Sequence, residues 1–486
     1  MICTDQQRWD TLRCYGFDRR APASDRLARE GARFERAFTT IAICSPARAS
    51  LLTGTYPHNH GMLNNTHERD AVLLDLPDGM QTVSQVLADS GYVCGYVGKW
   101  HVGRQKTPLD FGFTDVLVGH RPPGAGPPPT VQARSHPEYL AEERIDAPSG
   151  EPEQIVWMLR HNGYFAASGR ATGPPEATRA AYLAAEGKRL LRAYASQSSP
   201  FFMRIDFPEP HWPCVVPEPY ASMYPARDIP PWPNFGDDFT GKPAAYRQRQ
   251  RQWAAHRLEW RQWADYVSKY LGLTALLEDL IADILALLDE LGIADRTLVI
   301  HTSDHGDMAG SHGLFNKGPM MVEEIYHIPL LLRWPGRVPA GLAVEELVLN
   351  MDLMPTLLEA AGLPAPSGLD ARSLMPLLDG DDAQWPNHVF WEYHGEELGL
   401  YSQRGIRTAR HKYVYNANDI DELYDLEADP AELHNRIDDP ACQVLLDDLR
   451  ERMLDEMRRT DDMIARWTPA QIDRRLRADR PPDTID

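Results

Sequence analysis

The chain has 486 residues, of which 43% are hydrophobic and 25% are charged, a balance typical of a globular protein with a large core. This composition excludes a disordered chain, a collagen-like fibre and a small disulfide-stabilised scaffold. The formal net charge of −20 repels a nucleic-acid backbone, so we expect no nucleic-acid partner. Six cysteines without a C-x-x-C pair indicate reduced thiols and argue against a disulfide framework or a zinc ribbon.

No apolar run reaches the ~18–20 residues that span a bilayer, and residues 1–8 do not resemble a signal peptide. We therefore predict no membrane span and a cytoplasmic location. Asp5 is expected to end a central strand, yet few residues precede it, whereas a typical strand has about five to six. This shortness predicts that the natural chain starts upstream of Met1, where a signal peptide would escape detection.

In the first third of the chain, short β-like runs alternate with helical patterns, which predicts a sheet with helices on its faces. Helices are expected over residues 23–31 and 81–90, and strands over 32–38 and 92–97. From about residue 120 to 262 the periodicity fades and prolines cluster. Long loops and short helices are predicted there, interrupted by one strand over 201–205.

Apolar residues at i, i+3, i+4 and i+7 spacing over 273–291 predict a long amphipathic helix that ends at Gly292. A strand over 297–300 follows, and Asp304 and His305 come after it, where open α/β sheets bind ligands. Strand-like runs at 389–391, 405–407 and 412–415 precede a charged terminal helix. We predict an α/β domain over 1–386 and a smaller α+β domain over 387–486.

Cys44 is expected at the amino-terminal end of a helix, because Pro46 falls near a helix start. Such a position lowers a thiol pKa and favours a bound anion. From this placement alone, Cys44 is either a nucleophile or a buried structural cysteine.

Cys44-Ser45-Pro46-Ala47-Arg48, followed by Leu52-Thr53-Gly54, resembles the C-x-P-x-R signature of type I sulfatases, in which the cysteine is oxidised to formylglycine. Four further elements match in the family's order: residues 4–10, 98–103, 210–213, and 302–307 with Lys317. Even 422–430 resembles the family's carboxy-terminal sequence. The resemblance implies an alkaline phosphatase-like α/β/α sandwich with a large mixed sheet, plus a smaller C-terminal domain with an antiparallel sheet.

The resemblance also implies roles for ten residues. One divalent metal would be held by Asp5, Gln6, Asp304 and His305, whose mostly hard oxygen donors suit Ca²⁺, with Mg²⁺ or Mn²⁺ as alternatives. The aldehyde made from Cys44 would be hydrated, and one hydroxyl would attack sulfur. The remaining roles are to stabilise the hydrate (Arg48), to neutralise developing charge (Lys99 and Lys317), to act as base (His101) and to act as acid (His211).

We therefore predict a sulfuric ester hydrolase that acts on a small-molecule or oligosaccharide sulfate ester, with a formylglycine-generating enzyme as partner. The sequence does not predict the oligomeric state. The alternative is a phosphonate monoester or phosphodiester hydrolase of the same superfamily, a branch with similar Gln and His ligands that lacks the G-K-W-H element. A binding protein that lost catalysis is disfavoured, because Cys44 and Arg48 are both present. No histidine stands four residues after an aspartate, which argues against a two-metal alkaline phosphatase site.

Two groups of residues are candidates for the walls of a substrate pocket. Tryptophans in the irregular segment would either stack on sugar rings or pack in the core, namely Trp212, Trp232, Trp253, Trp260 and Trp263. The smaller domain offers Glu392, His394 and Tyr401.

Overall fold

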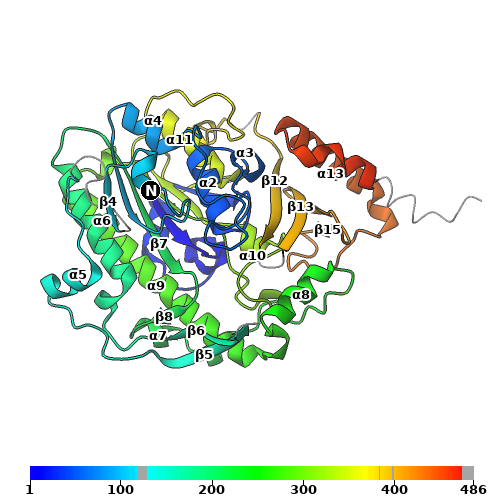
Figure 1. The fold of residues 1–486 in the computed structure, drawn as a ribbon, viewed down its shortest axis with the longest axis horizontal. Coiled ribbons are helices and arrows are strands. Elements are labelled where there is room, and N and C mark those ends of the chain that lie inside the picture. The colour runs from blue at the N-terminus through cyan, green and yellow to red at the C-terminus, as the bar shows by residue number, and fades with distance from the viewer. Residues whose placement is uncertain (119–128, 161–162, 382–383, 397–398, 473–486) are drawn as a thin grey trace, which may run out of the picture.

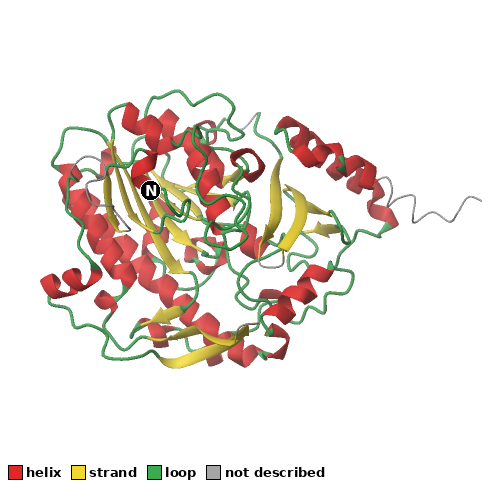
Figure 2. Cartoon of the chain, viewed as in Figure 1, coloured by secondary structure: helices red, strands yellow, loops and turns green. Residues whose placement is uncertain are grey.

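A computed structural model describes residues 1–118, 129–160, 163–381, 384–396 and 399–472. A large sheet lies between two layers of helices, and a smaller sheet lies beside it (Figure 1). Figure 2 shows the same view, in which the strands of the two sheets form separate groups. This arrangement confirms the predicted α/β/α sandwich with a second, smaller sheet.

The large sheet has eight strands among the described residues, and all but β10 run parallel. Its central strands β1 and β9 are buried at every residue, as expected for strands covered on both faces, although several of these residues are polar. Their spatial order is β11 (Leu342–Leu349), β2 (Ala32–Phe38), β10 (Leu330–Arg333), β9 (Val299–Ser303), β1 (Ile2–Asp5), β7 (Phe201–Pro210), β3 (Val93–Gly98) and β4 (Asp115–Val118).

Helices cover both faces of this sheet. One layer consists of α1 (Pro22–Glu30), α6 (Arg179–Ala195) and α9 (Trp260–Glu290), whose apolar stripes share a core with β1 and β7. The other consists of α2 (Cys44–Thr53), α4 (Val83–Asp89), α11 (Leu353–Ala360) and α12 (Met375–Leu378). None of the described helices combines the length and apolar character needed to cross a membrane.

The smaller sheet is antiparallel and contains the three predicted strands of the C-terminal segment. Its strands are β12 (His388–Glu396), β13 (Gly399–Thr408), β14 (His411–Asn416) and β15 (Glu422–Asp425), with helix α13 (Gln443–Arg459) packed on it. Trp391 and Ile406 share one hydrophobic cluster with Phe38 and Met321, so the two sheets have a common core. The boundary at residue 386/387 stays a prediction.

The expectation for residues 120–262 was right for the strand over 201–205, which lies in β7, and for short helices, but it underestimated the regular structure. Of this stretch, 119–128 and 161–162 lie outside the described residues, but the rest contains regular structure that proline clusters obscured. It includes helix α6, a small sheet of β5 (Glu153–Arg160), β6 (Gly163–Arg170) and β8 (Cys214–Val216), and the helices α5 (His136–Glu143), α7 (Tyr220–Met223) and α8 (Ala244–Gln252). Helix α9 also starts earlier than predicted, at Trp260, and buries Trp263 and Tyr266.

The start of helix α1 also differs from the prediction in detail. The helix begins at Pro22, one residue before the predicted start, and Ser24 lies in its first turn. The Ser24 hydroxyl donates to Oε1 of the buried Glu278 at 2.6 Å, and burial raises the pKa of Glu278 to about 7. Tertiary packing against α9 therefore decides the role of this serine.

Candidate active site

The ten predicted site residues come together at the carboxyl edge of the large sheet. Asp5 ends β1, Asp304 directly follows β9, Lys99 directly follows β3 and His211 directly follows β7. Parallel strands end at the same edge, and therefore four segments far apart in sequence meet there. Cys44 is the first residue of α2, as predicted, and lies at the same edge.

Helix α2 presents Cys44 at its amino terminus and is buried along its whole length. It ends at Gly54, whose φ of 67° is the left-handed conformation that closes many helices. The Cys44 sulfur lies 3.8 Å from Asp5 Oδ1 and 3.2 Å from His305 Nε2. Burial opposes ionisation of this thiol, but Lys317, Lys99 and His305 hold its pKa well below the usual value.

Donor atoms suited to a metal ion surround Cys44. One side-chain atom each of Asp5, Cys44, Asp304 and His305 lies within 4.8 Å of the others. His305 Nδ1 is 2.8 Å from the Gly306 carbonyl oxygen, which fixes its proton there and leaves the Nε2 lone pair facing these donors. Two carboxylates, an amide oxygen and an imidazole nitrogen fit a hard divalent cation.

Hydrogen bonds hold the side-chain amide of Gln6 in one orientation. Its Nε2 donates to Asp307 Oδ2 and, at 3.0 Å, to Asn316 Oδ1. Its Oε1 therefore points the other way and accepts from Lys317 Nζ at 3.0 Å. Asp307 was part of the quoted motif but was not predicted as a site residue, although it determines which atom Gln6 offers.

Three cations balance the buried carboxylates. Lys99 Nζ contacts Asp5 Oδ2, and Arg48 bridges Asp5 and Asp304. Burial and Cys44 oppose ionisation of Asp5, yet Lys99, His211 and Arg48 together hold its pKa well below the usual range. Burial also opposes the charge on Lys317, but Cys44 and Asp5 raise its pKa. Three cationic side chains thus gather at one site in a protein of strongly negative net charge, each facing buried acidic groups.

The two predicted acid–base histidines line the same pocket but make different contacts. His211 Nδ1 is 2.7 Å from the Trp212 carbonyl oxygen and is occupied by that contact. The other ring nitrogen, Nε2, is therefore the one available for proton transfer, and it lies 3.4 Å from Lys317 Nζ. His101 has a φ of 60°, uncommon for a residue with a side chain. Burial and the nearby Lys99 lower the pKa of His101 to about 4.

A pocket of about 400 Å³ opens onto these residues. Cys44, Lys99 and Lys317 line it together, whereas Asp304 is fully buried and does not border it. Further lining residues that the sequence did not identify are Asn65, His67, Glu68, Arg249, Asn316, Tyr393 and Glu396. The segment around residues 65–68 has no periodicity or motif, and only the structure could bring it to the site.

The prediction of which residues of the smaller sheet form the pocket wall was wrong. Glu392, His394 and Tyr401 do not line the pocket, but Tyr393 and Glu396 do. Side chains alternate along β12, and a register shift between Tyr393 and Gly395 brings Glu396 to the side of Tyr393. Glu392 is instead buried and pairs with His58.

The five tryptophans were expected either to line a sugar-binding pocket or to pack in the core, and the structure contains examples of both. Trp212 lines the pocket. Trp253 and Trp263 are fully buried and pack around Phe315, which places them in the core. Trp232 and Trp260 are partly buried and contact each other edge to face.

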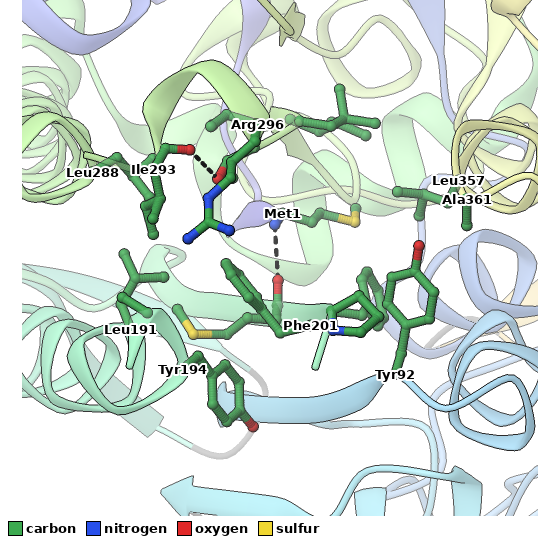
Figure 3. Close-up of a pocket in the computed structure, with 18 of the residues that line it drawn as sticks. Met1, Tyr92, Leu191, Tyr194, Phe201, Leu288, Ile293, Arg296, Leu357 and Ala361 are labelled. Carbon is green, nitrogen blue, oxygen red and sulfur yellow. Dashed lines mark hydrogen bonds between the residues drawn. The ribbon is translucent and has the colours of Figure 1, made fainter. Parts of the chain in front are cut away.

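A second cavity, of about 380 Å³, lies at the opposite edge of the sheet and is mostly apolar (Figure 3). Met1, Phe201 and Val299 line it near the amino ends of β1, β7 and β9. None of the ten predicted site residues borders this cavity, so we do not associate it with catalysis.

Comparisons with known proteins agree with this geometry. Residues 1–363 match the family model described as Sulfatase, and residues 310–459 match the one described as N-sulphoglucosamine sulphohydrolase, C-terminal. The multifunctional alkaline phosphatase superfamily protein PehA of Trinickia caryophylli is 29% identical over 506 aligned residues, covering 93% of this chain and 94% of that protein. The N-acetylglucosamine-6-O-sulfatase of Bacteroides thetaiotaomicron is 26% identical, covering 89% and 81%. The solved phosphonate monoester hydrolase of Agrobacterium radiobacter superposes with a TM-score of 0.74 at 26% identity, covering 94% and 95%.

Proposed function

The chain belongs to the sulfatase family and is a sulfuric ester hydrolase, and from this premise we propose that it releases sulfate from a sulfated carbohydrate at the Cys44 pocket. The observation that supports the reaction most strongly is the convergence of Cys44, Lys99 and Lys317 on one pocket. The substrate class rests on the similarity to a sugar sulfatase and on the aromatic and polar walls formed by Trp212, Tyr393 and Glu396.

Family membership implies a divalent metal and a formylglycine, and we propose Ca²⁺ as the ion, held by Asp5, Gln6, Asp304 and His305. When present, the metal would withdraw charge from sulfate oxygens, and the hydrated aldehyde made from Cys44 would supply the attacking hydroxyl. We also propose a formylglycine-generating enzyme as partner and a cytoplasmic location.

The chain's own side chains have separable tasks in this proposal. Lys99 and Lys317 would bind the sulfate oxygens and offset the charge that develops on them in the transition state. His101 would take a proton from the nucleophile. His211 would deliver one from Nε2 to the leaving oxygen, since its Nδ1 is engaged by the Trp212 carbonyl.

The phosphonate monoester or phosphodiester hydrolase alternative has one specific observation in its favour. Gln6 and His305 occupy ligand positions, as in that branch, and a solved phosphonate monoester hydrolase is among the similar structures. Lys99 and His101, which belong to the element absent from that branch, both line the pocket here. We therefore favour sulfate esters as the principal substrates.

The test is sulfate release by enzyme coexpressed with a formylglycine-generating enzyme. An aryl sulfate, an aryl phosphonate monoester and a panel of sulfated mono- and oligosaccharides are compared at equal enzyme concentration. The proposal expects the highest kcat/KM on a sulfated sugar. A higher kcat/KM on the phosphonate monoester than on every sulfate ester would favour the alternative instead.

A further inference from the structure

His67 contacts the predicted base His101 from the mouth of the pocket. Its Nδ1 lies 2.7 Å from His101 Nε2, and the two rings stack with centroids 4.8 Å apart. His67 lines the same pocket as Cys44, yet 57% of its side chain is exposed. It therefore connects a mostly buried imidazole to solvent.

The other nitrogen of His67 faces a carboxylate. His67 Nε2 is 3.2 Å from Glu68 Oε1, and the Glu68 side chain is 29% exposed. Arg104 Nη2 donates to the Glu68 backbone oxygen at 2.5 Å and holds this segment in place. Glu68, His67 and His101 thus form a continuous row that runs from solvent toward Cys44.

The proton positions follow from these contacts. If His67 donates from Nε2 to Glu68, its Nδ1 is an acceptor, and His101 must donate to it from Nε2. His101 Nδ1 is then an unprotonated nitrogen, and it is buried with no hydrogen-bond partner among the described residues. Cys44 and His101 are close enough for each to shift the other's pKa. Nδ1 is therefore the nitrogen left to accept a proton from the nucleophile.

Other charged groups around His67 agree with this arrangement. Partial burial lowers the pKa of His67, Lys99 and Lys317 lower it further, and Glu68 and Cys44 oppose them. Since the pKa of His101 is also low, both rings are neutral at neutral pH.

We propose that His67 relays the proton that His101 removes from the nucleophile, with Glu68 stabilising the charge that arrives on His67. The nucleophile's O–H bond breaks and a bond to His101 Nδ1 forms. The Nε2–H bond of His101 then breaks and a bond to His67 Nδ1 forms. Finally, His67 releases its Nε2 proton through Glu68 to water, so each ring gains and loses one proton and is left with its proton on Nδ1. Passage of one proton in the reverse direction, from water to His67 Nε2, from His67 Nδ1 to His101 Nε2 and from His101 Nδ1 to water in the pocket, restores the starting tautomers. This role rests on the proposed function; His67 acts through His101 and is a positioning residue.

Kinetics of three variants test the relay with an aryl sulfate. His67→Ala is expected to lower kcat about 10–100-fold with little change in KM. Because the site of His67 is open to solvent, added imidazole should restore activity in proportion to its neutral form. His67→Gln retains hydrogen-bonding groups but cannot transfer a proton, so its kcat should be as low as that of His67→Ala. His434→Ala, an exposed histidine outside the pocket, is the control and should match the unmodified sequence. Full activity in His67→Gln would overturn the relay.

A second measurement needs no substrate and separates this inference from the proposed function. In protein with ¹⁵N-labelled histidine, long-range ¹H–¹⁵N spectra at neutral pH report which ring nitrogen of each histidine is protonated. His67 and His101 should both have their proton on Nε2. A proton on His101 Nδ1 would overturn the relay whatever the enzyme hydrolyses. The expected tautomers without sulfate release from any tested ester would contradict only the proposed function.

Discussion

Arg48 Nε lies 2.8 Å from Asp304 Oδ2, which joins the first half of helix α2 to the end of strand β9. The same guanidinium reaches Asp206 on β7 at 2.9 Å and Asp5 on β1 at 3.3 Å. All four side chains are fully buried. The planar guanidinium of Arg48 therefore fixes helix α2, which carries Cys44, relative to strands β1, β7 and β9.

Replacing Arg48 with methionine should destabilise the fold strongly. The variant would leave three buried carboxylates short of a cation, which typically costs about 3–5 kcal/mol. Urea denaturation measures the loss in free energy of unfolding. Arg29→Met, in an exposed position on α1, is the matched control and should change stability by about 0.5 kcal/mol or less. Similar values for the two variants would contradict the bridging role of Arg48.

Cys44 should be the modified residue and the nucleophile. Peptide mass spectrometry of coexpressed enzyme is expected to show the aldehyde at Cys44 and unmodified thiols at the other cysteines. Cys44→Ala should lower kcat by at least about four orders of magnitude, because no other group replaces the nucleophile. Cys14→Ala, at a partly exposed cysteine outside the pocket, should retain activity. Activity of Cys44→Ala near the original level would rule out this assignment.

Asp307 should control metal affinity without touching the ion. In Asp307→Asn the acceptor that orients Gln6 can become a donor, so the Gln6 amide would no longer be held with Oε1 toward the site. Loss of such an orienting partner typically weakens metal binding by about 10–100-fold. Calorimetric titration of metal-depleted protein with Ca²⁺ measures this change. Asp283→Asn, at an exposed aspartate on α9, is the control, and an effect no larger than this control's would show that Gln6 needs no such support.

His58 should make stability depend on pH. It pairs with Glu392 at 2.8 Å and contacts the Thr460 carbonyl oxygen at 2.9 Å, which joins α3 (Pro57–His60) to the C-terminal segment. Burial opposes the imidazolium, but Glu392 raises the pKa of His58 from 6.5 to about 9, and the paired Glu392 has a pKa well below its usual value. The folded state thus binds the His58 proton more tightly than the unfolded state. This stabilisation is complete below about pH 6.5 and is lost as pH rises through 9.

His58→Gln tests this dependence. It should remove about 3 kcal/mol of unfolding free energy near pH 6 and little near pH 9.5. Chemical denaturation at several pH values provides the measurement, and His434→Gln serves as an exposed control. A destabilisation that stays constant across this range would show that packing, not the ion pair, is what His58 contributes.

Much of the fold was predictable because its elements have strong local patterns. The strand over 32–38 and the helix ending at Gly292 follow apolar periodicity, and the structure has both. Helix α6 was not predicted, although its buried face is apolar. It lies in the segment 120–262, for which the proline clusters were taken to indicate loops and short helices. Ser24 shows a different limit, since its partner Glu278 is 254 residues away.

The site was predictable where motifs follow strands, and unpredictable where tertiary structure brings in loops. Asp5 and Asp304 could be paired because their motifs resemble the sulfatase family's and each stands at the end of a predicted strand, whereas nothing in the sequence placed His67 beside His101. Backbone conformation was equally hidden, since Gln6, His101 and Asn316 all adopt positive φ, which sequence patterns do not predict for such residues. On β12, one irregular position decided which side chains reach the pocket.

Helix α2 is buried over all ten residues from Cys44 to Thr53. A small ester can reach Cys44 through the pocket, but an enzyme that oxidises Cys44 by grasping the flanking peptide needs that peptide extended and exposed. If a formylglycine-generating enzyme acts on Cys44 as proposed above, the burial of α2 requires that the conversion precede closure of the fold. Under that proposal, a chain that folds first would keep its thiol, and the yield of competent enzyme would depend on the relative rates of oxidation and folding.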